Sequence, residues 1–193
     1  FSRCDTLDMA KYLLKYNFNP LVLNMGNNIS PGGGVRNGAT AQEECIFRRS
    51  NSHLTLTENL YPLLEHQSIY SPDILVFKDK DYILIEPFNI SLITICALRN
   101  PSILMDDYLH DSDTLIMKYK ITSIIKTAIH YEHDSLLLGA FGCGAFKNPP
   151  KKVAEIFKEV IIEYKTFFKL IVFAILDDDN TNNYDIFIDI FRN

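Results

Sequence analysis

The sequence predicts an α/β protein, a three-layer α/β/α sandwich built on a mixed, mostly parallel sheet. Helical and extended segments alternate along the 193 residues. The extended segments, such as residues 21–25, 135–138 and 170–176, are nearly continuous apolar runs, which is typical of strands covered by helices on both faces. Two of these runs lead directly into glycine-rich loops. Because ligands of such sheets bind at the carboxyl ends of the strands, we expect both loops at one site.

The first half of the chain predicts the following elements in order. Residues 6–16 carry leucine and alanine at helical spacing, and the apolar run 21–25 predicts a buried strand. A helix is expected over residues 39–49, soon after the first glycine loop. Residues 74–77 and 82–85 flank a polar turn and predict a hairpin or two edge strands, and residues 91–96 predict another central strand.

The second half repeats the alternation. An apolar stripe at helical spacing predicts a helix over residues 113–133, and the run 135–138 then predicts a strand. Pro149 and Pro150 open a helix over residues 151–164, because proline is tolerated in a first helical turn. The apolar run 170–176 predicts a strand that ends at an acidic cluster, and a short helix closes the chain.

Composition limits the class of protein. A hydrophobic content of 47% and the absence of a Pro-rich or Ser/Gly-rich linker predict one domain over residues 1–193. The net charge of −5 argues against broad electrostatic binding of nucleic acid. No apolar run is long enough to span a bilayer, and the first residues lack the pattern of a signal peptide. We expect a monomer that is cytoplasmic or nuclear, without membrane contact and without sequence-specific nucleic-acid binding.

The sequence shows no pattern typical of a metal site or a disulfide framework. The four cysteines are widely spaced and form no CxxC pair, which fits a reducing compartment. His130 and His133 have no further ligand nearby in sequence, and the acidic runs 106–107 and 177–179 are typical of solvated loops. We therefore predict no metal and no cofactor.

The first glycine loop contains Gly32, Gly33 and Gly34 and precedes the residues Gln42, Glu43 and Glu44. Three consecutive glycines allow main-chain N–H groups to approach an anion or a sugar, and a helix start beside such a loop favours anions. Adjacent helical residues differ by about 100° in direction, so we expect only one of the two carboxylates to face the loop. One catalytic carboxylate is then favoured over a pair, although a solvated face is the simpler explanation of Gln-Glu-Glu alone.

The second glycine loop, residues 139–146, has three glycines between a predicted strand and a predicted helix. Its consecutive N–H groups could hold a diphosphate without a basic side chain. It lacks the Lys-Ser/Thr pair of a P-loop and does not match G-x-G-x-x-G. Cys143 would act as a nucleophile only with a general base, and none is visible nearby.

Residues 31–44 resemble the GGG-x(6–8)-QEE signature of the poly(ADP-ribose) glycohydrolases, with seven residues between the two parts here. Residues 5–7, 22–24, 48–50, 70–73, 139–146 and 172–177 are similar to segments of the microbial-type branch, in the same order. The resemblance covers nearly the whole chain. It implies a macrodomain-like sandwich that binds ADP-ribose and hydrolyses the ribose–ribose bond of poly(ADP-ribose) on modified proteins.

The resemblance also implies residue roles. Glu44 corresponds to the carboxylate that protonates the leaving ribose oxygen and then activates water, which suits an oxocarbenium-like transition state, and Glu43 contacts the ribose on the leaving side. Gly142, Cys143, Gly144 and Ala145 would wrap the diphosphate. Phe146 would hold the proximal ribose or simply pack in the core. The remaining ligand-binding candidates are Gly32, Gly33, Gly34 and Gln42.

Three further positions carry two interpretations each. Asn27 or its neighbour Asn28 would contact a sugar. Asp5 would read the adenine amino group or cap a helix. Phe173 would stack on adenine or pack in the core.

The resemblance leaves two other functions open. A non-catalytic macrodomain that only binds ADP-ribose would keep both glycine loops. The chain is also expected to lack most of the N-terminal region of full-length family members, whose loss could weaken contacts with adenine or polymer. A hydrolase of mono-ADP-ribosyl groups is the second alternative, because the same pocket could accept another leaving group.

Overall fold

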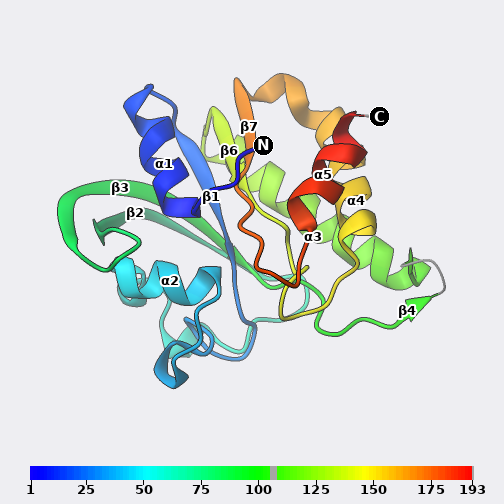
Figure 1. Cartoon of the computed structure of the whole chain (residues 1–193), viewed down its shortest axis with the longest axis horizontal. Coiled ribbons are helices and arrows are strands. Elements are labelled where there is room, and N and C mark those ends of the chain that lie inside the picture. Colours follow the sequence, from blue (N-terminus) through cyan, green and yellow to red (C-terminus); the bar gives the residue numbers. More distant parts are fainter. Residues whose placement is uncertain (105–107, 193) are drawn as a thin grey trace.

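The computed structural model describes residues 1–104 and 108–192 (Figure 1); the acidic pair Asp106 and Asp107 lies outside them. The main sheet has five strands in the order β2-β3-β1-β6-β7. Strands β3, β1, β6 and β7 are parallel to one another, and β2 is antiparallel to β3. The bounds of these strands are Pro20–Met25 (β1), Ser68–Lys78 (β2), Leu84–Ile95 (β3), Ser135–Leu138 (β6) and Leu170–Phe173 (β7). The predicted mixed, mostly parallel sheet is confirmed.

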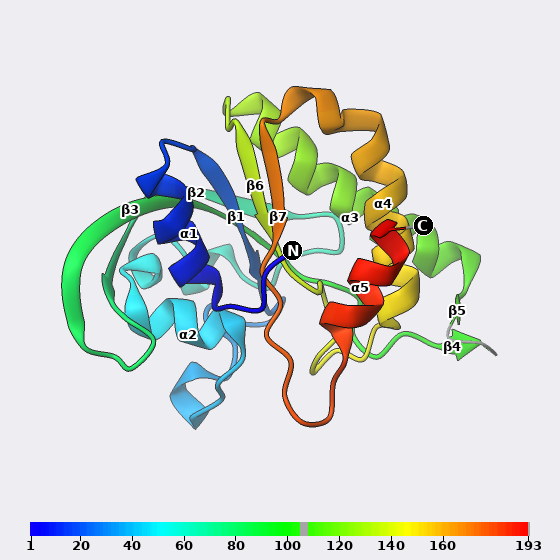
Figure 2. The ribbon, with the colours of Figure 1, turned by 45° about the horizontal axis from the view of Figure 1, so that its top comes forward.

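Helices cover both faces of the sheet, so the three layers are also confirmed. Figure 2 shows α1 and α2 on one side of the strands and α3, α4 and α5 on the other. The helices span Thr6–Lys15 (α1), Gln42–Arg49 (α2), Asp111–His130 (α3), Pro150–Tyr164 (α4) and Asn183–Arg192 (α5). A two-stranded ribbon of β4 (Ile103–Leu104) and β5 (Tyr108–Leu109) precedes α3. None of the helices in the described residues is long and apolar enough to cross a membrane.

Side chains of the central strand β1 point alternately to the two faces of the sheet, and each face has its own hydrophobic core. Leu21 and Leu23 pack in the cluster that contains α3, α4 and α5. Val22, between them, packs in the cluster of α1 and α2. Neighbouring strand residues point to opposite faces, and all three side chains are fully buried, as the continuous apolar run predicted.

One prediction about the strands was wrong. Residues 82–85 and 91–96 do not form separate strands, because Leu84–Ile95 is one strand that pairs with β2 from Lys78 back to Ser68. The first half of β3 is largely exposed and contains Pro87 and Asn89. These residues interrupt the apolar pattern, since this part of the strand extends beyond the parallel core and pairs only with β2.

The parallel strands place their carboxyl ends at one edge of the sheet. β1 ends at Met25 just before the first glycine loop, β3 ends at Ile95, and β6 ends at Leu138 just before the second loop. The direct neighbours of β1 are β3 and β6. The two loops therefore start side by side.

Candidate active site

The first glycine loop binds both carboxylates of the Gln-Glu-Glu sequence. Glu43 accepts hydrogen bonds from the backbone N–H of Asn27 at 2.7 Å and of Gly32 at 3.2 Å. Glu44 accepts one through Oε1 from the N–H of Gly34 at 2.8 Å. Both side chains are buried. The expectation that only one carboxylate faces the loop was wrong, because the loop curls around the first turn of α2 and offers N–H groups in two directions.

The two oxygens of Glu44 differ in their surroundings. Oε1 holds the bond from Gly34, whereas Oε2 is buried and has no hydrogen-bond partner among the described residues. A buried carboxylate oxygen without a partner loses its hydration without compensation. The arrangement therefore leaves one oxygen of Glu44 for a ligand or a proton.

Burial raises the pKa of Glu43 to about 8. The negative charge of Glu44 also contributes to this raised value, while the N–H groups of Asn27 and Gly32 act in the opposite direction by stabilising the carboxylate. Burial outweighs these two hydrogen bonds. Glu43 is thus expected to hold its proton at neutral pH, which reduces repulsion between the two acids.

Gln42 joins the start of α2 to the end of β1. Its Oε1 accepts a bond from the N–H of Met25 at 2.8 Å, and its Nε2 donates to the carbonyl oxygen of Leu23 at 2.7 Å and to Thr6 Oγ1 at 3.2 Å. Ala41, the residue before α2, provides no side-chain cap. Gln42 was predicted to bind ligand, and this stays a prediction; the residue lines the cavity that the two loops share, and its amide fixes the start of α2 against β1.

The two loops share a cavity of about 140 Å³. Its walls come from four positions of the first region (Asn27, Gln42, Glu43 and Glu44), five of the second loop (Ala140, Gly142, Gly144, Ala145 and Phe146), and Met25 and Ala41. The structure therefore brings together most of the residues singled out by sequence. Gly32, Gly33, Gly34 and Cys143 do not line this cavity.

Side chains are excluded from part of the second loop. A β-carbon on Gly142 would come within 2.5 Å of Ala97 Cβ and of Asn148 Nδ2. The Cys143 thiol is buried and directed to the carbonyl oxygen of Phe141 at 3.7 Å. Burial raises its pKa, so the thiolate that a nucleophile requires is disfavoured.

Asp5 and Phe173 lie outside the cavity. Asp5 caps α1 by accepting bonds from the N–H groups of Leu7 and Asp8, and it pairs with the buried guanidinium of Arg49 at 2.7 Å. Phe173 is 2% exposed, and the ring of Phe1 stacks on it with the centroids 5.0 Å apart. The structure thus shows the helix cap for Asp5 and core packing for Phe173, and their contacts with adenine stay predictions.

Asn27 lines the cavity, and its Oδ1 accepts a bond from the N–H of Ile29 at 2.7 Å. Asn28 lines a neighbouring cavity instead.

Sequence reasoning missed Tyr61, whose buried hydroxyl has no hydrogen-bond partner in the described part of the chain. Burial and the charge of Glu43 raise its pKa. No local pattern around Tyr61 indicates this proximity.

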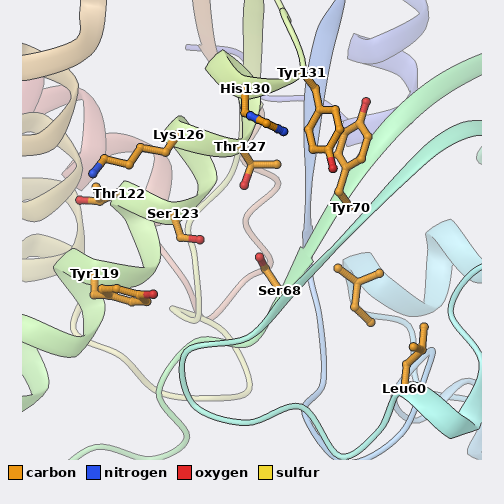
Figure 3. Close-up of a pocket in the computed structure, with 11 residues that line it drawn as sticks. Leu60, Ser68, Tyr70, Tyr119, Thr122, Ser123, Lys126, Thr127, His130 and Tyr131 are labelled. Atoms are coloured by element: carbon orange, nitrogen blue, oxygen red, sulfur yellow. The ribbon is translucent and has the colours of Figure 1, made fainter.

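A larger groove of about 780 Å³ lies elsewhere, between β2 and α3 (Figure 3). Its walls carry hydroxyl groups such as those of Ser68, Ser123 and Thr127, and the stacked rings of Tyr70 and Tyr131 close one end. Its described lining residues include no carboxylate and no part of either glycine loop. In residues 1–104 and 108–192, no cluster of His, Cys, Asp or Glu could hold a metal ion.

Comparison with known proteins identifies the relatives of this site. The family model "Microbial-type PARG, catalytic domain" matches residues 2–79, which include the first glycine loop and both carboxylates. A search of curated proteins gave no significant match.

Solved structures match over nearly the whole chain. Poly(ADP-ribose) glycohydrolase from Thermomonospora curvata is 29% identical, with a TM-score of 0.88, over 98% of this chain and 75% of that one. The enzyme from Deinococcus radiodurans in complex with ADP-ribose is 27% identical, with a TM-score of 0.86, over 99% of this chain and 82% of that one. The T. curvata enzyme bound to the inhibitor ADP-HPD is 29% identical, with a TM-score of 0.87, over 97% and 77%. The resemblance to the microbial-type poly(ADP-ribose) glycohydrolases predicted from the sequence is therefore confirmed, and the fold of this chain is theirs.

Proposed function

We propose that residues 1–193 form one catalytic domain that hydrolyses the ribose–ribose bonds of poly(ADP-ribose) and releases ADP-ribose, with Glu44 as the general acid and base. The observation that carries the assignment is the state of the Glu44 carboxylate. One oxygen is held by the N–H of Gly34, and the other is buried beside the second glycine loop without a hydrogen-bond partner in the described part of the chain. Such a group is positioned precisely and still has an oxygen available for chemistry.

The reaction needs one proton moved twice. Protonated Glu44 gives its proton to the ribose oxygen that leaves as the glycosidic bond breaks. The resulting carboxylate then takes a proton from the water that attacks the anomeric carbon, which restores the acid. Because Oε1 is fixed by its hydrogen bond, Oε2 can carry out both proton transfers, the first to the leaving ribose oxygen and the second from the attacking water.

Glu43 supports this cycle as a neutral, protonated side chain, so it adds no second negative charge beside Glu44. Its pKa of about 8 keeps it mainly protonated at neutral pH, so it does not oppose the ionised state of Glu44. Its bonds to Asn27 and Gly32 hold the loop against α2. We propose that it contacts the ribose on the leaving side.

The second loop is proposed to hold the diphosphate through backbone N–H groups. Gly142, Gly144, Ala145 and Phe146 line the cavity, and none of them contributes a cation. This suits a chain with a net charge of −5, since backbone dipoles can bind an anion locally. The diphosphate of the substrate would also stabilise the positive charge that develops on the ribose.

The partners that we propose are ADP-ribose and ADP-ribose polymers on modified proteins, bound by a monomer. The bacterial enzyme of similar fold was solved with ADP-ribose bound, which supports this choice. An intracellular location stays a prediction.

The test is Glu44→Gln, which keeps the shape of the side chain and removes the acid. We expect release of ADP-ribose from poly(ADP-ribose) to fall at least about a hundredfold, the lower end for loss of a general acid–base, while ADP-ribose binding measured by calorimetry survives. Glu86→Gln, at an exposed position of β3, is the matched control and should turn over like the wild type.

Each other result has a clear meaning. An unchanged rate in Glu44→Gln would remove Glu44 from the mechanism. Binding without release by the wild type would favour a non-catalytic reader. Release only from mono-ADP-ribosylated protein would favour the hydrolase of single units.

A further inference from the structure

A second cavity, of about 190 Å³, lies beside the first at the carboxyl end of β3. Asn28, which lines it, directly follows Asn27 of the first cavity. Arg99 also lines it, and its guanidinium lies 5.2 Å from the ring centroid of Phe146, a wall of the first cavity. Burial raises the pKa of the Cys96 thiol, which lines the second cavity, and the charge of Glu43 in the first cavity adds to this effect. The two cavities are therefore neighbours.

The second cavity contains a buried cation. Lys120, on α3, is 3% exposed, and its ammonium donates to the carbonyl oxygen of Glu65. It forms no ion pair within the described residues. Burial lowers its pKa, which the nearby Glu65 and Cys96 oppose. Glu65 also lines this cavity, and its carboxylate acts on Lys120 only at longer range than an ion pair. A buried ammonium without a direct ion pair is costly, so an anion that bound it in the cavity would offset that cost.

Arg99 adds a second cation to the same wall. Its side chain is exposed, and its one hydrogen bond among the described residues is a long one of 3.4 Å to Asn28 Oδ1. The guanidinium can therefore turn toward a ligand at little cost. Among the residues that the structure describes, no aromatic ring lines this cavity, so they offer no stacking surface for a base. Two cations without an aromatic wall suit a phosphate group.

The order of the strands gives the direction of a bound polymer. The second glycine loop follows β6, Glu44 contacts the loop that follows β1, and the second cavity follows β3. Since these strands are neighbours in the order β3-β1-β6, a chain whose diphosphate lies at β6 and whose reacting ribose lies at β1 continues toward β3.

We propose that the second cavity binds a phosphate group of the next ADP-ribose unit, the unit whose ribose oxygen leaves. This inference rests on the proposed function. It makes Lys120 and Arg99 substrate-binding residues on the leaving side, whereas free ADP-ribose would occupy only the first cavity.

The experiment compares two ligands in the inactive Glu44→Gln background. Adding Lys120→Met should weaken binding of poly(ADP-ribose) of defined length at least about tenfold and leave the affinity for ADP-ribose unchanged, both measured by calorimetry. It should also lower the slope of log affinity against log salt, because one phosphate contact is lost. Lys120→Arg should restore most of the polymer affinity. Lys126→Met, on the same helix but at the separate groove of Figure 3, is the control and should leave polymer affinity unchanged.

Equal polymer affinity in Lys120→Met and the background would overturn the proposal, as would an equal loss for both ligands. If Lys120→Met does not fold, Arg99→Gln decides, since Arg99 is exposed and its variant should also lose affinity for polymer alone. Failure of the proposed function is seen separately, because it would appear as no release of ADP-ribose from polymer by the wild type.

Discussion

Gly33→Ala tests whether the first glycine loop positions the carboxylates. Gly33 has a φ of +51°, where an alanine costs about 1–2 kcal/mol. A β-carbon there would also lie 2.6 Å from Glu44 Oε1 and 3.0 Å from Glu43 Oε2. Glu44 must then move away from the N–H of Gly34, and the lost bond to a charged group is worth about 1.5–3 kcal/mol. Since about 1.4 kcal/mol is a factor of ten in rate, turnover should fall roughly 10- to 100-fold.

Gly38→Ala is the matched control. Gly38 has a φ of +80°, but nothing lies within 4 Å of its added β-carbon. Gly38→Ala should lower the melting temperature by about 2–8 °C, the shift expected for about 1–2 kcal/mol in a domain of this size, and Gly33→Ala should lower it further because it also loses the hydrogen bond between Gly34 and Glu44. Only Gly33→Ala should lose turnover, measured as ADP-ribose released from poly(ADP-ribose) below the melting transition. Wild-type turnover in Gly33→Ala, or an equal loss in Gly38→Ala, would refute the argument.

Two further predictions concern stability. Burial raises the pKa of Glu43 to about 8, so between about pH 4.5 and 8 the folded state keeps a proton that the unfolded chain has lost, and the free energy of unfolding should fall as pH rises through this window. In Glu43→Gln the melting temperature, recorded from about pH 5 to 9, should fall less with rising pH than in the wild type. Parallel curves of melting temperature against pH for the two proteins would disprove the prediction. Arg49→Met should cost about 1.5–3 kcal/mol in urea unfolding, because the buried guanidinium loses charged hydrogen bonds to Asp5 and Asp8. Arg36→Met, in an exposed pair with Glu58, should cost at most about 1 kcal/mol; equal losses would count against the buried pair.

Local patterns were sufficient to predict the layers and the meeting of the two loops. Continuous apolar runs such as residues 135–138 reveal burial on both faces, and strand, loop and helix follow each other directly at both loops. The orientation of Glu43 and Glu44 could not be predicted in the same way. It depends on how the loop curls back on α2, and helical periodicity describes only the helix itself.

The second cavity was even less predictable from local sequence patterns. Lys120 reads in sequence as one polar position of a helical stripe, and Arg99 as a loop residue. Their proximity depends on α3 packing beside the end of β3, which no spacing in the sequence encodes. The full length of β3 could not be predicted, because Pro87 breaks the apolar strand pattern in the sequence. The proline is tolerated in the structure because this part of the strand runs beyond the parallel core.

The contacts of Gln42 bear on which changes of chain length the site can accept. Its amide bonds to Met25 and Leu23 fix where α2 begins relative to β1, so the two following carboxylates occupy set backbone positions. An insertion between Gln42 and Glu44 would rotate a carboxylate by about 100° away from the loop. The seven residues 35–41 are instead mostly exposed, and Gly38 borders open space. A residue added or removed there changes only the length of an outer turn, which explains why the interval between the glycines and Gln-Glu-Glu can vary while the three residues themselves stay contiguous.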